Sequence, residues 1–291
     1  MDMGFLPYLL RRATQDILKE TAGSTFPNLP GEKLERFPVA LPPLAEQRRI
    51  AAILNEQMAA VERARAAAEA QLEAAKALPA AYLRAVFSSP ETQQWTRKRL
   101  EDVSKLLPSK SIATDGDAEV QAITTACLSE AGFLTGGIKT ARMRSEDLVE
   151  CTVARGEVLV ARSNTPELVG RVAMFPGKPK GAVASDLTIR IWPTNDIAAE
   201  FLTAYLSFLY QTGYWRERAG GASGSMKKIT REQIQAQQIP VPNVVDQQHI
   251  AATLSEQVAS AERARKAIEE ELDAINKLPA ALLSRAFAGE L

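Results

Sequence analysis

Apolar residues recur at seven-residue intervals in two long stretches of the chain, residues 44–78 and residues 244–278. Both stretches are rich in alanine, glutamate, glutamine and arginine, and neither contains glycine or proline. This pattern predicts two long helices that pair through a heptad seam, and we expect Pro79 and Pro279 to end or kink them. The seam residues are Leu54, Val61, Ala68 and Ala75 in the first helix and Leu254, Ala261, Ile268 and Ile275 in the second.

An arginine interrupts the seam once in each helix, at Arg65 and at Arg265. Two interpretations are open. In the first, the aliphatic stem of each arginine lies along the groove between the helices while its charge stays in water. Alternatively, the two arginines form a polar layer that sets the register and the direction of pairing.

The two helices are copies within an internal repeat with an offset of 200 residues. Gln47–Phe87 aligns with Gln247–Phe287 without a gap, and more than half of the aligned positions are identical. A weaker likeness continues upstream, so residue 1 corresponds to residue 201. The repeat predicts two helices that pair antiparallel and hold a globular unit at one end. The expected parts are a C-terminal remnant of a first globular domain (1–43), a first spacer helix (44–89), a complete globular domain (90–243) and a second spacer helix (244–291).

Residues 90–243 are predicted to form an α+β domain. Its candidate strands are rich in valine and isoleucine and are separated by glycine and proline. We expect helices over residues 198–215 and 230–236, the second with Thr230 as its N-cap. The candidate strands are Val120–Thr124, Glu157–Arg162, Val169–Phe175, Ser185–Trp192 and Gln238–Val241.

Charge is distributed unevenly although the total is balanced, with 35 lysines and arginines and 35 aspartates and glutamates. Residues 160–231 hold ten basic and five acidic side chains, whereas residues 244–291 hold five basic and eight acidic ones. The zero net charge excludes a uniformly basic nucleic-acid coat protein. It is compatible with a basic patch in the globular domain together with an acidic second helix.

Three loops of the basic segment are candidates for DNA contact, at residues 162–165, 177–181 and 220–228. Arginine and asparagine form bidentate hydrogen bonds with base edges, and lysines, hydroxyls and glycine-rich backbone bind phosphate. Each loop taken alone also fits a solvated turn. The candidate DNA-binding residues are Arg162, Ser163, Asn164, Thr165, Lys178, Lys180, Ser223, Ser225, Lys227 and Lys228.

The chain lacks the residue clusters that catalysis or metal binding would need. His249 is the single histidine, and Cys127 and Cys151 are the two cysteines. Their spacing fits neither a zinc ribbon nor a disulfide scaffold, so we interpret the cysteines as buried small hydrophobes. We expect no catalytic residue, no metal, no cofactor and no membrane span, and the cysteine usage suits a reducing cytoplasm.

The residues that lead into each helix resemble a known motif. Ile239–Pro242 followed by Asp246–Ile250, with the counterpart Val39–Ile50, is similar to the start of the spacer helix in specificity (S) subunits of Type I restriction-modification systems. The stretch Gly156–Asn164 followed by Gly170 resembles another motif of that family. Here Glu157 replaces the usual aspartate.

The resemblance implies a non-catalytic protein that binds double-stranded DNA. Each target-recognition domain of the family reads one half of a bipartite site, and the antiparallel coiled coil sets the spacing between the halves. Modification methyltransferase subunits dock on this scaffold and methylate adenine, and an ATP-driven restriction subunit adds translocation and cleavage. The acidic second helix would then provide a docking surface.

One departure from the family concerns residues 1–43, which correspond to the end of a first recognition domain only. Three explanations are open: a truncated reading frame, a subunit completed by a second S-type chain, or a half subunit that pairs with itself. We expect this piece to be completed in trans or loosely ordered, because it is too short to bury a core. The apolar residues that need a partner surface are Phe5, Leu6, Tyr8, Leu9, Leu10, Ile17 and Leu18.

A different class of function is also compatible with the two helices. The chain would then be a coiled-coil interaction scaffold whose globular domain binds protein rather than DNA. The basic segment 160–231 argues against this alternative.

Overall fold

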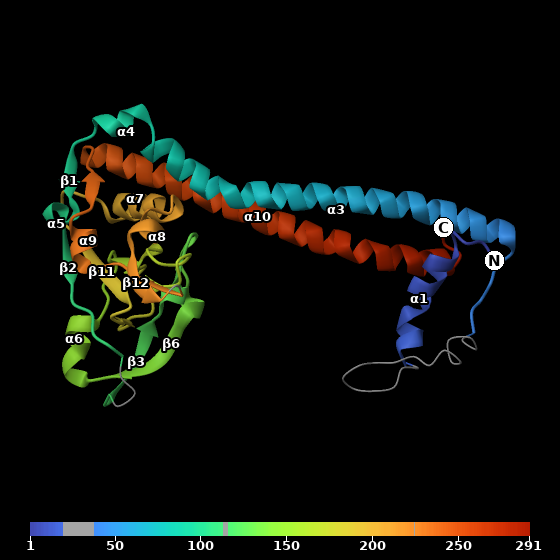
Figure 1. Cartoon of the computed structure of the whole chain (residues 1–291), viewed down its shortest axis with the longest axis horizontal. Coiled ribbons are helices and arrows are strands. Elements are labelled where there is room, and N and C mark those ends of the chain that lie inside the picture. The colour runs from blue at the N-terminus through green and yellow to red at the C-terminus, as the bar shows by residue number, and fades with distance from the viewer. Residues whose placement is uncertain (20–37, 113–115, 224) are drawn as a thin grey trace. The chain divides into compact units, whose positions relative to one another are not determined.

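The computed structural model describes residues 1–19, 38–112, 116–223 and 225–291, with the side chains of residues 14–19, 222 and 223 left out. Figure 1 shows the helices and strands, coloured from blue at the N-terminus to red at the C-terminus. The chain forms two compact units, one of residues 1–75 with 264–291 and the other of residues 76–263.

Two long helices dominate the chain, α3 (Leu44–Phe87) and α10 (Val244–Phe287), and they confirm the helices predicted from the repeat. Pro79 and Pro279 lie inside them, so neither proline ends its helix, and a kink at each proline stays a prediction. A proline inside a helix loses one backbone hydrogen bond. Buried residues in the turns that follow, such as Leu83 and Leu283, offset that loss.

In the unit of residues 1–75 with 264–291, α3 and α10 pack side by side through the predicted seam (Figure 1). Val61 and Ala68 of α3 form one buried cluster with Ile275 of α10. Leu54 meets Leu283 in a second cluster, so the two helices run antiparallel. Four residues of the predicted seam, Leu54, Val61, Ala68 and Ile275, are thus buried in these clusters.

The two seam arginines pair along their own helices. Arg65 Nε lies 3.0 Å from Glu69 Oε1, and Arg265 Nη1 lies 2.6 Å from Glu269 Oε1. These ion pairs join residues four apart in one helix, so they do not set the register between helices. Pairing along the helix is compatible with both interpretations of these arginines.

Helix α1 (Leu6–Lys19) packs on the ends of the two long helices in the same unit. Phe5, Tyr8 and Leu9 are buried against apolar residues of α3 and α10. These three residues therefore find on α3 and α10 the partner surface that they need, and completion of residues 1–43 in trans stays a prediction. Ile17, Leu18 and residues 20–37 of the predicted remnant lie outside the described side chains.

The repeated glutamine in the first turn of each long helix has a structural role. Gln47 is buried, its amide donates to the Pro42 carbonyl at 2.7 Å, and its Oε1 accepts from the Asp2 amide at 2.8 Å. Gln247 does the same with the Pro242 carbonyl at 2.8 Å and the amide of Ala198 at 2.8 Å. Each glutamine ties the start of its helix to a segment that leads into a second helix.

The unit of residues 76–263 is built on a four-stranded antiparallel sheet in the order β2-β11-β7-β9. One face packs against α7 (Ala199–Gln211), whose Phe201 and Leu202 are fully buried. The other face packs on a cluster that contains Ile123 and Phe175. The strands are β2 (Ser104–Leu107), β7 (Val158–Ala161), β9 (Val172–Met174) and β11 (Thr188–Pro193).

Among the described residues of this unit, four smaller sheets complete the fold, in the orders β10-β3-β6, β12-β13-β8, β1-β14 and β4-β5. Each predicted strand overlaps an observed one, which confirms the α+β fold class. The strands are β1 (Arg97–Arg99), β3 (Ala118–Ile123), β4 (Leu128–Ser129), β5 (Gly132–Phe133), β6 (Ile138–Met143), β8 (Ser163–Asn164), β10 (Val183–Ala184), β12 (Gly220–Ser223), β13 (Met226–Lys228) and β14 (Gln238–Pro240).

The predicted helix over residues 198–215 is divided in two. Gly213, with φ of +77°, separates α7 from α8 (Tyr214–Arg218) because only glycine adopts that conformation readily. Thr230 caps α9 (Arg231–Gln235) as predicted. The other short helices are α4 (Pro90–Gln94), α5 (Leu100–Val103), α6 (Leu148–Cys151) and the 3-10 helices η1 (Thr125–Cys127), η2 (Thr135–Gly137) and η3 (Ser145–Asp147).

Candidate nucleic-acid interface

The sheet β12-β13-β8 joins two of the loops that the sequence nominates for DNA contact. In the antiparallel pairing of β13 with β8, Lys227 lies opposite Asn164 and Lys228 lies opposite Ser163. Lys228 is exposed, and Lys227 is half-buried. Two cations therefore lie beside a hydroxyl and an amide on one small sheet, although the two segments are far apart in the sequence.

Asn164 is already hydrogen-bonded at both ends of its amide. Its Nδ2 donates to Thr125 Oγ1 at 3.1 Å, and its Oδ1 accepts from the backbone amide of Thr165 at 2.9 Å. The side chain thus connects β8 with η1. An adenine edge would have to replace at least one of these partners.

Arg162 lies at the junction between β7 and β8 and is half-buried. Its Nη1 donates to the Asp186 carbonyl at 3.4 Å, and its own carbonyl accepts from the Ile229 amide at 2.9 Å. Its Nε is buried and has no hydrogen-bond partner within the described residues. The pKa of the nearby Glu232 carboxyl is lowered, first by the hydrogen bond of its own backbone N–H and then by the Thr230 hydroxyl. The positive charge of the Arg162 guanidinium lowers it further by a smaller amount.

Lys178 and Lys180 lie apart from that sheet, on a turn between Gly177 and Gly181, whose φ values are +89° and +73°. Both lysines are exposed, and they line a cavity of about 710 Å³ together with Gln121, Thr135 and Ile138. Of the remaining candidates, the Ser223 side chain lies outside the described residues, and Ser225 is exposed.

The stretch that begins at Gly156, which resembles a motif of the family, contributes a buried charged residue to the core of the domain. Glu157 and Arg190 are both almost fully buried and form a bidentate ion pair, with Nε–Oε2 and Nη2–Oε1 distances of 2.8 and 2.9 Å. Arg190 also donates to three backbone carbonyls, those of Pro108, Glu150 and Thr152. A buried ion pair needs such additional partners to offset its desolvation.

Sequence reasoning missed the role of Arg190. The signal was present, because this arginine interrupts the otherwise apolar strand Thr188–Ile191. A charge inside a buried strand requires a buried partner, and Glu157 was the available carboxylate.

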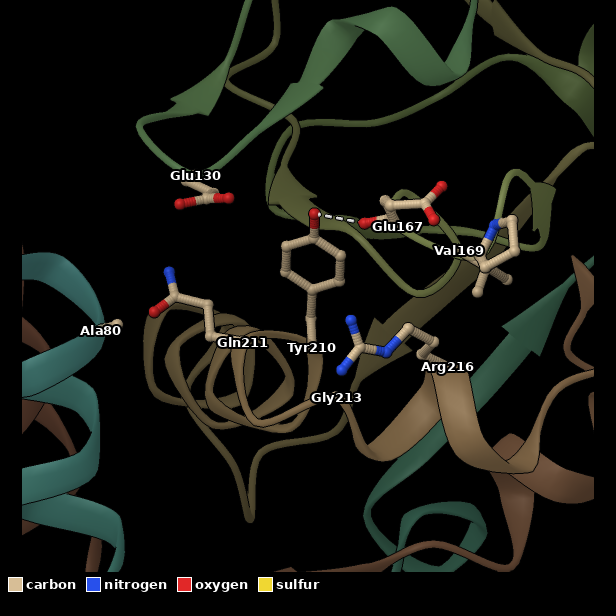
Figure 2. A pocket seen from close by; sticks show the side chains of 9 residues that line it. Ala80, Glu130, Glu167, Val169, Tyr210, Gln211, Gly213 and Arg216 are labelled. Carbon is tan, nitrogen blue, oxygen red and sulfur yellow. Dashed lines mark hydrogen bonds between the residues drawn. The ribbon is translucent and has the colours of Figure 1, made fainter. Parts of the chain in front are cut away.

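A smaller cavity of about 260 Å³ lies between α7 and the loop before β9. Figure 2 shows the Tyr210 ring standing between Glu130 and Glu167, and its hydroxyl donates to the Glu167 carbonyl at 2.9 Å. Arg171 lies near the same ring, with its Cζ 5.8 Å from the centroid. None of the candidate DNA-binding residues lines this cavity.

Cys127 and Cys151 are buried, and burial raises the pKa of both thiols, which confirms their interpretation as small core residues. Within the described ranges, no three histidine, cysteine, aspartate or glutamate residues gather as metal ligands. In the same ranges, no helix has the length and apolarity of a bilayer span.

Two curated proteins are similar to most of this chain. The Type I restriction enzyme EcoKI specificity subunit of Escherichia coli K12 is 24% identical over 289 residues, and the alignment covers 93% of this chain and 61% of the relative. The StySPI specificity subunit of Salmonella potsdam is 23% identical over 288 residues, with the same coverage. The chain therefore spans about three fifths of the length of these relatives.

Two solved structures share the fold. The HsdS subunit from Thermoanaerobacter tengcongensis matches with a TM-score of 0.63 and 20% identity, over all of this chain and 71% of that one. A chain from work on complex assembly and conformational transition of the type I R-M system matches with a TM-score of 0.74 and 21% identity, over 99% of this chain and 71% of that one.

The family model described as the Type I restriction modification DNA specificity domain matches residues 2–73 and 92–273. These ranges include most of α3, nearly all of the globular domain and much of α10. The chain belongs to the family of Type I restriction modification DNA specificity domains.

Proposed function

We propose that this chain is the sequence-specific DNA-recognition subunit of a Type I restriction-modification complex and that its globular domain reads one half of a bipartite site. The observation that carries the proposal is the pairing of β13 with β8, which places Lys227 and Lys228 beside Asn164 and Ser163. Cations for phosphate and polar groups for base edges are the combination that DNA reading requires.

The candidate residues divide by chemistry into two proposed roles. The four lysines (Lys178, Lys180, Lys227, Lys228) contact phosphates, supported by the hydroxyls of Ser163, Thr165, Ser223 and Ser225. Asn164 contacts a base edge after it exchanges its hydrogen bond with Thr125. Arg162 is half-buried and its Nη1 donates to the Asp186 carbonyl, so we assign it either a base contact through its guanidinium or the positioning of β8.

The two long helices form the proposed scaffold for the other subunits. Modification methyltransferase subunits would dock on the helices, where α10 contributes exposed acids such as Glu256 and Glu270. Adenine methylation and ATP-driven cleavage belong to the methyltransferase and restriction subunits, so this chain needs no cofactor and no catalytic residue of its own. A second S-type chain or a second copy would read the other half-site, and we place the complex in the cytoplasm, with the DNA.

The dependence of DNA binding on salt tests this proposal. Duplex DNA should bind the chain reconstituted with its modification subunit, and the affinity should fall steeply as salt rises. The variant K227A/K228A should bind every sequence more weakly, with a salt slope lower by about two. Absence of DNA binding, together with nuclease-resistant capture of a protein by the globular domain, would favour the protein-interaction alternative.

A further inference from the structure

Strands β3 and β6 form an antiparallel ribbon of six residue pairs, with the short strand β10 beside only its last two β3 positions. Residues directly opposite each other in such a ribbon project on the same side. One side carries Val120 and Met143, which are buried. The other side, named the ribbon face, consists of Glu119, Gln121 and Ile123 of β3 opposite Arg142, Thr140 and Ile138 of β6, and only Ile123 at its end is buried in the core.

The central pair of the ribbon face is polar and open. Gln121 lies opposite Thr140, and both side chains are exposed. Neither makes a side-chain hydrogen bond with any residue that the structure describes. The neighbouring Arg142 differs, because its Nε donates to the Gly116 carbonyl at 2.6 Å. The Gln121 amide therefore offers both its donor and its acceptor to a ligand.

Cations border the same face. Gln121 and Ile138 line the cavity of about 710 Å³ whose other wall is the turn from Gly177 to Lys180. Lys178 and Lys180 are exposed on that turn, and neither forms an ion pair with a described residue. The Gln121 amide can hydrogen-bond to a ligand in this cleft, and the two lysines at its edge attract negative charge. The expected ligand is therefore a polyanion that also carries hydrogen-bond donors and acceptors.

Double-stranded DNA has both features. Its major groove is about 12 Å wide and admits a two-stranded ribbon, and glutamine forms bidentate hydrogen bonds with adenine N6 and N7. Thr140 would lie next to that base, and Ile138 supplies an apolar contact such as the thymine methyl group accepts. Lys178 and Lys180 would hold phosphates of the adjacent backbone.

We propose that the ribbon face is a second DNA-contact surface of the domain, in which Gln121 is a specificity-determining residue that reads an adenine. The proposal rests on the proposed function and adds a surface outside the sheet β12-β13-β8. It assigns Lys178 and Lys180 to the ribbon face and leaves Lys227 and Lys228 to the other sheet.

The test is selection from a randomised double-stranded DNA library by the full chain with its modification subunit. The variant Q121L removes the amide at nearly constant size, and Q93L on the exposed face of α4 is its matched control. Q121L should lose the preference for adenine at one position of the selected site. Its affinity for the wild-type site should be about five- to a hundredfold lower than that of the wild-type chain. Q93L should select the wild-type site.

A second comparison tests the lysines. K178A/K180A should lower the affinity for every sequence and reduce the salt slope by about two, while K105A on β2 changes little. Thermal unfolding of each variant separates loss of contact from loss of fold. If the wild-type chain selects a site and Q121L selects the same site with equal affinity, the ribbon-face proposal is overturned and the proposed function stands. If the wild-type chain selects no site, both fail.

Discussion

Phe5, just before α1, packs against Phe287, the last residue of α10, with the ring centroids 5.3 Å apart. In the other unit, Tyr205 of α7, which the offset of 200 residues aligns with Phe5, packs against Phe87, the last residue of α3, at 5.2 Å. Each long helix thus ends on an aromatic contact with a shorter helix. The internal repeat of the sequence is therefore also a repeat of contacts, and α1 holds the place in its unit that α7 holds in the globular domain.

The Phe5 contact should stabilise the unit that contains it. The variant F5A removes a fully buried ring and should lower the free energy of unfolding by about 3 kcal/mol. L10A, at an exposed position of α1, is the control and should change little. Urea unfolding followed by circular dichroism measures both. Equal midpoints for F5A and L10A would mean that α1 does not stabilise the helix ends.

The buried pair of Glu157 and Arg190 should be among the most sensitive positions of the domain. Glu157→Gln leaves the Arg190 charge without its partner in the core, and the expected loss of stability is about 3 to 5 kcal/mol. Glu146→Gln breaks the exposed pair of Glu146 with Arg144 and should have almost no effect. If both variants unfold at the wild-type temperature, the buried pair is not a stabilising element.

Gly170 should accept no side chain. Its φ is +83°, and a Cβ atom there would lie 2.5 Å from Trp215 Cδ1. Gly170→Ala should therefore cost about 2 to 4 kcal/mol through backbone strain and displacement of the indole. Gly136→Ala, where a Cβ would meet open space, is the control. Thermal unfolding reports the loss, and tryptophan fluorescence reports the displacement; an unchanged spectrum with full stability would contradict the structure around Gly170.

The two cysteines should be unreactive in the folded chain. Burial raises the pKa of the Cys127 and Cys151 thiols, so both stay protonated at pH 8 and are shielded from reagents. A disulfide-exchange reagent should label neither thiol in native protein and both in guanidinium chloride. The variant S88C, at an exposed position, supplies a rapidly labelled reference. Fast labelling of native wild-type protein would show that these core regions open.

Much of the fold was predictable because its signals are local. The heptad seam around Leu54 and Leu254 predicts the long helices, and the valine-rich runs predict the central strands. Whether Pro79 and Pro279 would end the helices could not be decided locally, because the burial of residues such as Leu83 in the following turns depends on the whole fold. Strand β13 was missed because its lysines and flanking glycines look like a loop until β8 pairs with it.

The candidate interface was predictable only in part. Composition identified the lysine-rich loops and the segment that begins at Arg162. It did not show that Asn164 and Lys227 would be neighbours, because strand register between distant segments depends on the whole fold. It also did not single out Gln121, because an exposed glutamine in a strand becomes informative only when the opposing strand and the lysine turn are placed around it.

The central proposal is that this chain determines which DNA sequence a Type I modification complex recognises. The most direct test is a genome-wide map of methylated adenine in cells that express the modification subunit with and without this chain. We predict methylation at adenines of one short sequence, present only when the chain is expressed and reduced by K227A/K228A. An identical methylation map in the presence and absence of the chain would contradict the proposal.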